Sequence, residues 1–128
     1  MADMTNAYEN DTINAMRGTA VAAWTPFAGL LTVVTDKEAG TVTEISYTGY
    51  ARASVTWAAP SAGLTSNANL LSFGKMTGGT GGTVNAVGIY TAASGGTLRY
   101  IITQSPGKVV AVNGTPEYAI GALTLEHK

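Results

Sequence analysis

The side chains that could do chemistry are few and scattered along this sequence. It has eight Asp and Glu residues, and hydrolysis of a glycosidic bond needs two of them flanking that bond. No pair is marked by its spacing, so folding would have to bring Glu44 and Glu117 together. Serine hydrolysis needs a histidine base, and the one histidine, His127, is next to the C-terminus, where we interpret it as a solvated tail residue. We therefore predict that the protein is not an enzyme and keep a small carboxylate enzyme as the third hypothesis.

Metal and cofactor sites have no support in the sequence either. Cysteine is absent, and one histidine does not make a two-histidine metal site. Residues 74–82 resemble a phosphate-binding loop, but a P-loop needs a glycine five residues before the Gly-Lys glycine and Ser or Thr after the lysine. Asn69 and Met76 stand in those positions. We expect no cofactor and interpret 74–82 as a flexible surface loop.

The aromatic side chains offer another possible site. Trp24, Trp57 and six tyrosines could form a sugar-binding platform, because sugars stack on aromatic faces much as cations do. Trp57 and Tyr100 fall on sets that face the predicted core, so we interpret both as core residues. The sequence leaves the placement of Trp24 and Tyr50 open.

The low charge of the chain is its most informative property. Charged residues make up 12% of it, against about 25% in ordinary soluble domains. Either partner subunits cover much of the surface, or a threonine-rich sheet surface keeps the protein soluble. The net charge of −1 predicts no nucleic-acid partner. The polar, acidic start has no signal-peptide pattern and the apolar runs are too short to span a bilayer, so we expect no membrane partner.

One helix is expected, over residues 3–17. Asn6 is the predicted N-cap, with Glu9 completing a capping box, and Gly18 ends the helix. Its apolar stripe is narrow, which makes the helix marginal by itself. It is expected either to cover one end of the protein or to reach another chain as an arm.

The rest of the sequence predicts short strands at roughly ten-residue spacing, typical of a β-sandwich or jelly roll. The clearest is a hairpin over 82–104 with a glycine-bearing turn. Both its faces are apolar, which suits a pair packed on both sides or packed on a partner. We predict a mainly β fold, an antiparallel β-sandwich or jelly roll with one N-terminal helix, divided into a helical segment (1–18) and a β-sandwich domain (19–128). The eight expected strands are 29–34, 41–47, 49–58, 67–73, 82–90, 97–104, 108–112 and 118–125.

The face assignments in the hairpin follow from alternation. They place Val87 with Ile89, and Val84 with Ala86 and Tyr90 on the opposite face. On the second strand, Leu98, Tyr100 and Ile102 share a face while Arg99 and Ile101 point the other way. Ser105-Pro106-Gly107 is predicted to be a turn.

Several short blocks occur in an order that resembles a family of small structural virion proteins of tailed bacteriophages, often labelled minor tail, tail fibre or minor capsid proteins. The match runs in register over most of the chain. The blocks are residues 5–10, 49–52 with 55–57, 87–90 with 92–96, 98–100 and 121–124.

The resemblance implies a non-enzymatic building block of a virion, made in the host cytoplasm. The leading hypothesis is a capsid-decorating or minor capsid protein on the capsid surface, which binds and stabilises the major capsid protein shell and forms a homo-oligomer, expected to be a trimer. The alternative is a tail fibre or tail-tip module in contact with tail proteins that binds a glycan of the host surface. The residues expected at the partner interface are Met4, Tyr8, Ile13, Met16, Trp24 and Tyr50.

Overall fold

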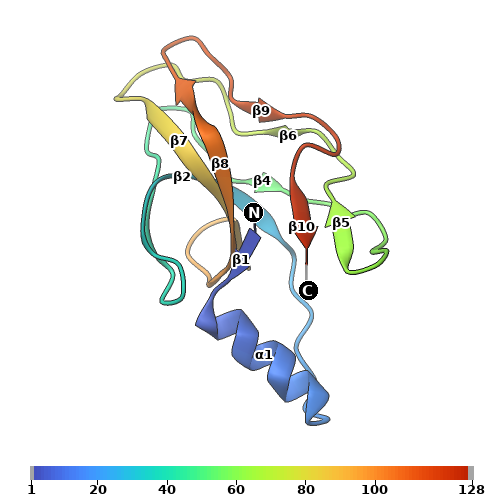
Figure 1. The fold of residues 1–128 in the computed structure, drawn as a ribbon. Helices are drawn as coiled ribbons and strands as arrows, with labels where there is room; N and C mark the ends of the chain where they lie inside the picture. The colour runs from blue at the N-terminus through green and yellow to red at the C-terminus, as the bar shows by residue number, and fades with distance from the viewer. Residues whose placement is uncertain (1, 127–128) are drawn as a thin grey trace.

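The computed structural model describes residues 2–126, and these form ten strands and one helix. A six-stranded sheet makes up one side of the molecule (Figure 1). All strand pairs are antiparallel, so the prediction of a mainly β antiparallel fold with one N-terminal helix is confirmed. Its strands, in spatial order, are β1 (Ala2–Met4), β8 (Leu98–Val110), β7 (Gly82–Tyr90), β2 (Phe27–Asp36) and β3 (Thr41–Glu44), with β4 (Ala53–Ser54) also paired to β2.

Two small sheets and irregular chain form the opposite side. One sheet pairs β5 (Leu64–Ser66) with β10 (Thr124–Glu126), and the other pairs β6 (Leu71–Ser72) with β9 (Glu117–Tyr118). The main core lies between the two sides and includes Leu30 from the large sheet and Phe73 from the opposite side, both fully buried. Because apolar side chains from both sides meet there, burial of their surface holds the two layers together.

The 82–104 hairpin is confirmed as the β7–β8 pair, and apolar side chains pack on both of its faces. On the outer face, Leu31, Ala86 and Ile101 are almost completely buried in a second cluster. Val34 and Val42 pack against this cluster from β2 and β3. The chain itself therefore covers the second face.

Two irregularities in β8 correct the predicted faces. Ile89 pairs with Tyr100 but Tyr90 pairs with Leu98, so Arg99 is an extra residue. A bulge of this kind shifts the alternation by one. As a result Leu98 lies in the outer cluster with Ile101, not on the face of Tyr100 as predicted.

The second irregularity replaces the turn that we expected at Ser105-Pro106-Gly107. Val84 pairs with Lys108 and Ala86 with Thr103, so residues 104–107 oppose Asn85 alone inside a continuous β8. The Ser105–Pro106 peptide bond is cis. The shift turns Val84 into the main core beside Val87, opposite to the prediction.

Several predicted strands are shorter than expected because side-chain amides take over the hydrogen bonding. In 49–58 only 53–54 form a strand, and in 67–73 only 71–72. Asn69 accepts from Thr56 N at 2.9 Å and donates to Ser54 O at 3.0 Å. Asn67, 1% exposed, donates to Ala119 O and accepts from Leu123 N. The predicted strand 118–125 is likewise split into β9 and β10, and β3 ends at Glu44 rather than at residue 47.

The helix α1 spans Asn6–Met16, so residues 2–4 form β1 rather than its first turn. Thr5, not Asn6, is the N-cap, and it makes no side-chain cap bond. Its hydroxyl donates instead to Leu98 O at 2.8 Å, which ties the start of the helix to β8. The predicted flexible loop 74–82 is also wrong in part, because Met76 is 1% exposed and its backbone bonds Asn113 and Gly114.

Candidate functional site

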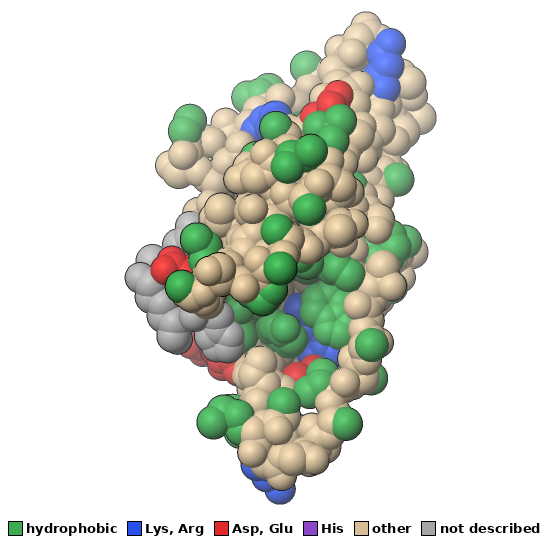
Figure 2. Space-filling model, turned by 90° about the vertical axis from the view of Figure 1, so that its right-hand side faces the viewer, with side chains coloured by type: hydrophobic (Ala, Val, Ile, Leu, Met, Phe, Trp, Pro, Cys, Tyr) green, Lys and Arg blue, Asp and Glu red, His purple; other side chains and the backbone are tan. Residues whose placement is uncertain are grey.

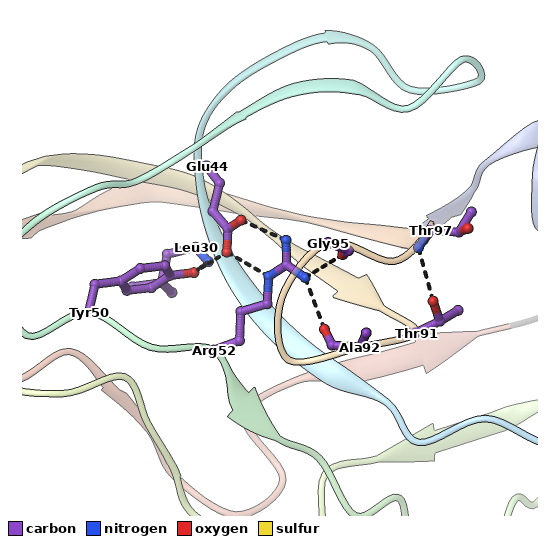
Figure 3. Close-up of polar contacts among 8 residues, drawn as sticks. All are labelled: Leu30, Glu44, Tyr50, Arg52, Thr91, Ala92, Gly95 and Thr97. Atoms are coloured by element: carbon purple, nitrogen blue, oxygen red, sulfur yellow. Dashed lines mark hydrogen bonds and ion pairs between the residues drawn. The ribbon is translucent and has the colours of Figure 1, made fainter.

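Glu44, one of the two carboxylates singled out in the sequence, lies in a polar cluster with Arg52. Arg52 Nε and Nη2 donate to the two Glu44 oxygens at 2.9 and 2.8 Å, a bidentate pair (Figure 3). The Tyr50 hydroxyl donates to Glu44 Oε2 and accepts from Leu30 N at 3.0 Å. Glu117 is exposed in β9 and takes no part in this cluster, so the paired carboxylates of a glycosidase are not assembled here.

The same arginine fixes the tip of the β7–β8 hairpin. Arg52 Nη1 donates to the carbonyls of Ala92 and Gly95 at 2.9 and 2.8 Å, and its guanidinium lies 3.6 Å from the centre of the Tyr90 ring. Within the tip, Thr97 N donates to Thr91 Oγ1 at 2.9 Å (Figure 3). Charge-assisted bonds of this kind are strong and directional, so the cluster clamps the loop 91–97 onto β3 and the chain before β4.

The ionisation of the cluster is that of a structural ion pair. The hydrogen bond to Glu44 raises the pKa of Arg52, and burial raises the pKa of the Tyr50 phenol. Burial also raises the pKa of Tyr90 to about 12. The guanidinium therefore stays charged and the phenols stay neutral near pH 7, so none of these groups is poised to exchange a proton there.

The predicted interface residues fall into four environments. Ile13 and Met16 are 55% and 88% exposed on α1. Met4 is half-buried against the main core, and Tyr50 is half-buried in the Glu44 cluster. Of the six, only Tyr8 and Trp24 are brought together, as an edge-to-face ring pair with centroids 6.0 Å apart. Contact of any of the six with a partner stays a prediction.

Helix α1 is attached only near its first half. Arg99, the extra residue of β8, forms an ion pair with Asp11 and donates to Ala7 O at 3.3 Å. The Tyr8 ring packs on Tyr100 at 5.3 Å, and no residue of the helix is fully buried. In Figure 1 the helix hangs below the sheets, so its last turns form a projecting arm.

An open groove lies between α1, the connecting segment 17–26 and the β5–β10 side of the molecule. Its volume is about 500 Å³, within the range of small-molecule sites. Figure 2 looks at this side and shows a hollow with hydrophobic side chains on its floor, beside atoms of a basic and an acidic side chain. The aromatic lining residues are Tyr8, Trp24, Trp57 and Tyr100, and the others are Ala22, Ala23, Pro26, Ala58, Pro60, Thr65, Ile89 and Leu125.

The sequence indicated part of this groove. The interpretation of Tyr100 as a core residue is confirmed, since it is 6% exposed, although its ring also reaches the groove. Trp57 is half-buried, packing on the core and lining the groove. The contributions of Pro60 and Leu125 had no signal in the sequence, because only the tertiary fold brings those segments beside α1.

Other classes of site find no support in residues 2–126. There is no group of three metal-ligating acids or histidines among them, and no helix with the length and hydropathy to cross a bilayer. His127 lies outside the described residues.

Comparison with known proteins identifies the family. No curated protein matches the chain. The family model described as podophage GP4 fiber I protein gp80 matches residues 3–126, nearly the whole chain. It confirms the resemblance to structural proteins of tailed phages, and it fits the tail fibre alternative better than the capsid-decorating function that we favoured from the sequence. The chain therefore belongs to the podophage GP4 fiber I protein gp80 family and is a structural phage protein of the virion.

Proposed function

We propose that this protein is a module of a podophage tail fibre that works through protein–protein contacts and not as an enzyme. The observation that carries the proposal is the family match over residues 3–126. The geometry agrees with it, because the strongest polar cluster uses Glu44 and Arg52 to hold a loop in place. The charged fraction of 12% is also what a surface hidden in an assembly would have.

The N-terminal arm is the part of the molecule best suited to hold a neighbouring subunit. An isolated helix of 11 residues is marginal in water, and this one leaves Ile13 and Met16 exposed on successive turns of its outer half. Residues three apart lie on the same helix face, so the two side chains present one apolar surface. We propose that this surface is covered by another copy in a homotrimer, or by an adjacent tail protein.

Cryo-EM of the particle that carries the protein tests this function. A fibre module is expected as density attached to the tail, present in the small copy number of the tail symmetry. Mass spectrometry of separated heads and tails should find the protein with the tails. A copy number in the hundreds, with the protein spread over the head shell, would replace the proposal with capsid decoration.

A further inference from the structure

The groove beside α1 has a continuous aromatic wall. The Tyr8 ring is the centre of it, with its edge-to-face contacts to Trp24 at 6.0 Å and to Tyr100 at 5.3 Å. Trp57 and Pro60 line the groove from the loop that precedes β5. The flat rings of Tyr8, Trp24 and Trp57 are half-buried and line an open groove, so they leave apolar faces in contact with water, which a ligand would cover.

The polar atoms of these rings are left without partners. Among the described residues, neither the hydroxyls of Tyr8 and Tyr100 nor the indole nitrogens of the two tryptophans make a hydrogen bond within the protein. The only fully buried side-chain polar atom without a partner in residues 2–126 is Arg99 Nε, so water reaches the four ring atoms. Buried Tyr and Trp side chains usually do find a partner for these groups.

Within residues 2–126, the groove has no charged side chain in its lining, which includes no Asp, Glu, Lys, Arg or His. The Arg99 guanidinium lies 5.8 Å from the centre of the Tyr8 ring, and Asp11 neutralises it in an ion pair. A charged ligand would therefore lose hydration without gaining a partner.

We propose that the groove binds a neutral saccharide. The C–H face of a sugar ring would stack on the aromatic side chains, and its hydroxyls would pair with the unpartnered hydroxyl and indole groups. A purely apolar peptide segment fits less well, because it would bury those four polar atoms without a hydrogen bond, which costs free energy. The inference goes beyond the structural role of the fibre module and does not depend on where in the virion the protein is located.

The chain offers a direct probe of this groove. It contains two tryptophans, Trp24 and Trp57, and both line the groove, so all intrinsic tryptophan fluorescence comes from residues of this site. The purified full chain is titrated with chitotetraose, cellotetraose and maltotetraose up to about 10 mM, with tetragalacturonate as the charged comparison, and binding is checked by changes in NMR spectra. A saturable change is expected with at least one neutral oligosaccharide, and no tighter binding of the charged one.

Variants separate binding from folding. Tyr8→Phe removes only a hydroxyl and is expected to weaken binding severalfold with an unchanged Tm. Trp24→Ala is expected to weaken binding at least about tenfold, the loss of one stacking contact, read by NMR because a fluorophore is lost. Ile120→Thr, at a 68% exposed apolar residue outside the groove, is the matched control and should bind like the wild type.

Three results would overturn the proposal. The first is a wild-type protein that binds none of the neutral oligosaccharides by either readout. The second is binding that Tyr8→Phe and Trp24→Ala leave intact, or that Ile120→Thr weakens equally. The third is a change of oligomeric state in Trp24→Ala, seen by sedimentation velocity, which would make the groove a subunit interface. Because all assays use the isolated chain, their failure would leave the location of the protein in the tail untouched.

Discussion

Replacing Arg52 by methionine is expected to destabilise the protein more than any other single change to its charged residues. The side chain of Arg52 is 9% exposed and that of Glu44 is 24% exposed. The variant keeps the aliphatic stem of the side chain but leaves the Glu44 carboxylate without its cation. It also removes the donor to the carbonyls of Ala92 and Gly95, so the loop 91–97 loses its attachment.

The magnitude follows from the burial of the pair. Removing one partner of a buried ion pair costs about 3–5 kcal/mol, and the partial exposure of Glu44 places this pair at about 3 kcal/mol. For a domain of this size, that lowers the Tm by roughly 10 °C. Replacing both members, in Arg52→Met/Glu44→Leu, should recover more than half of the loss, since no buried charge then remains without a partner.

Equilibrium unfolding in urea, followed by far-UV circular dichroism, measures these differences. The matched control is Arg17→Met, at the exposed C-cap arginine of α1, whose side chain bonds Asn14 alone among the described residues. It is expected to stay within about 0.5 kcal/mol of the wild type. A loss below about 1 kcal/mol for Arg52→Met, or a double variant no more stable than the single one, would refute the clamp.

Three further outcomes are expected. Gly49→Ala would place Cβ 2.2 Å from the Lys75 carbonyl oxygen at a φ of +103°, and it should lower the free energy of unfolding by several kcal/mol. Gly18→Ala has positive φ but open space around it, so it should lower that free energy by about 1 kcal/mol. Urea unfolding compares the two variants. Burial raises the pKa of Tyr118 to about 12, above its ordinary 10.0. The neutral phenol's contribution to the free energy of unfolding is therefore complete below pH 10 and is lost as the pH rises through about 12. Urea midpoints from pH 9 to 12 should fall less steeply in Tyr118→Phe than in the wild type, and equal slopes would contradict this. Met16→Lys, at a residue 88% exposed, should leave the unfolding free energy within about 0.5 kcal/mol while dissociating the proposed trimer in sedimentation velocity, and a trimer that persists would remove the arm from the assembly interface.

The sequence predicted what depends on local pattern. The β7–β8 hairpin has β-branched and aromatic flanks around a glycine-bearing turn, and both its position and its two apolar faces are confirmed. The helix is confirmed as well, but its N-cap is Thr5 and not Asn6, and the Thr5 hydroxyl donates to the Leu98 carbonyl in another strand. A capping pattern in the sequence does not reveal a hydrogen-bond acceptor that lies in a distant part of the chain.

The wrong strand-face and strand-length predictions share one cause: contacts between residues far apart in the sequence set the local backbone conformation. The bulge at Arg99 reverses the face of Leu98, and it accompanies the ion pair of Arg99 with Asp11 on the helix. Predicting faces from alternation assumes a regular strand ladder, so it cannot locate a bulge residue such as Arg99. In the same way Asn67 and Asn69 look like strand residues until the fold supplies backbone groups for their amides.

The candidate sites were the least predictable part of the molecule. The sequence offers Glu117 as the partner of Glu44 in a carboxylate pair. The actual partners of Glu44 are Tyr50 and Arg52, which lie in the irregular segment that follows β3. Of the groove residues, the sequence predicts Tyr8 and Trp24 at a partner interface, but their convergence with Trp57 depends on the path of the connecting segment 17–26.

The position of α1 in the chain has a mechanical consequence. The helix is preceded by β1, which pairs with β8, and followed by the connection to β2, which pairs with β7. A tensile load on the arm therefore enters the large sheet through two separate strands on either side of the β7–β8 pair. Because the load is shared, pulling the helix away would require breaking the β1–β8 hydrogen bonds. The other end of the helix would still be held by β2, which lies inside the sheet.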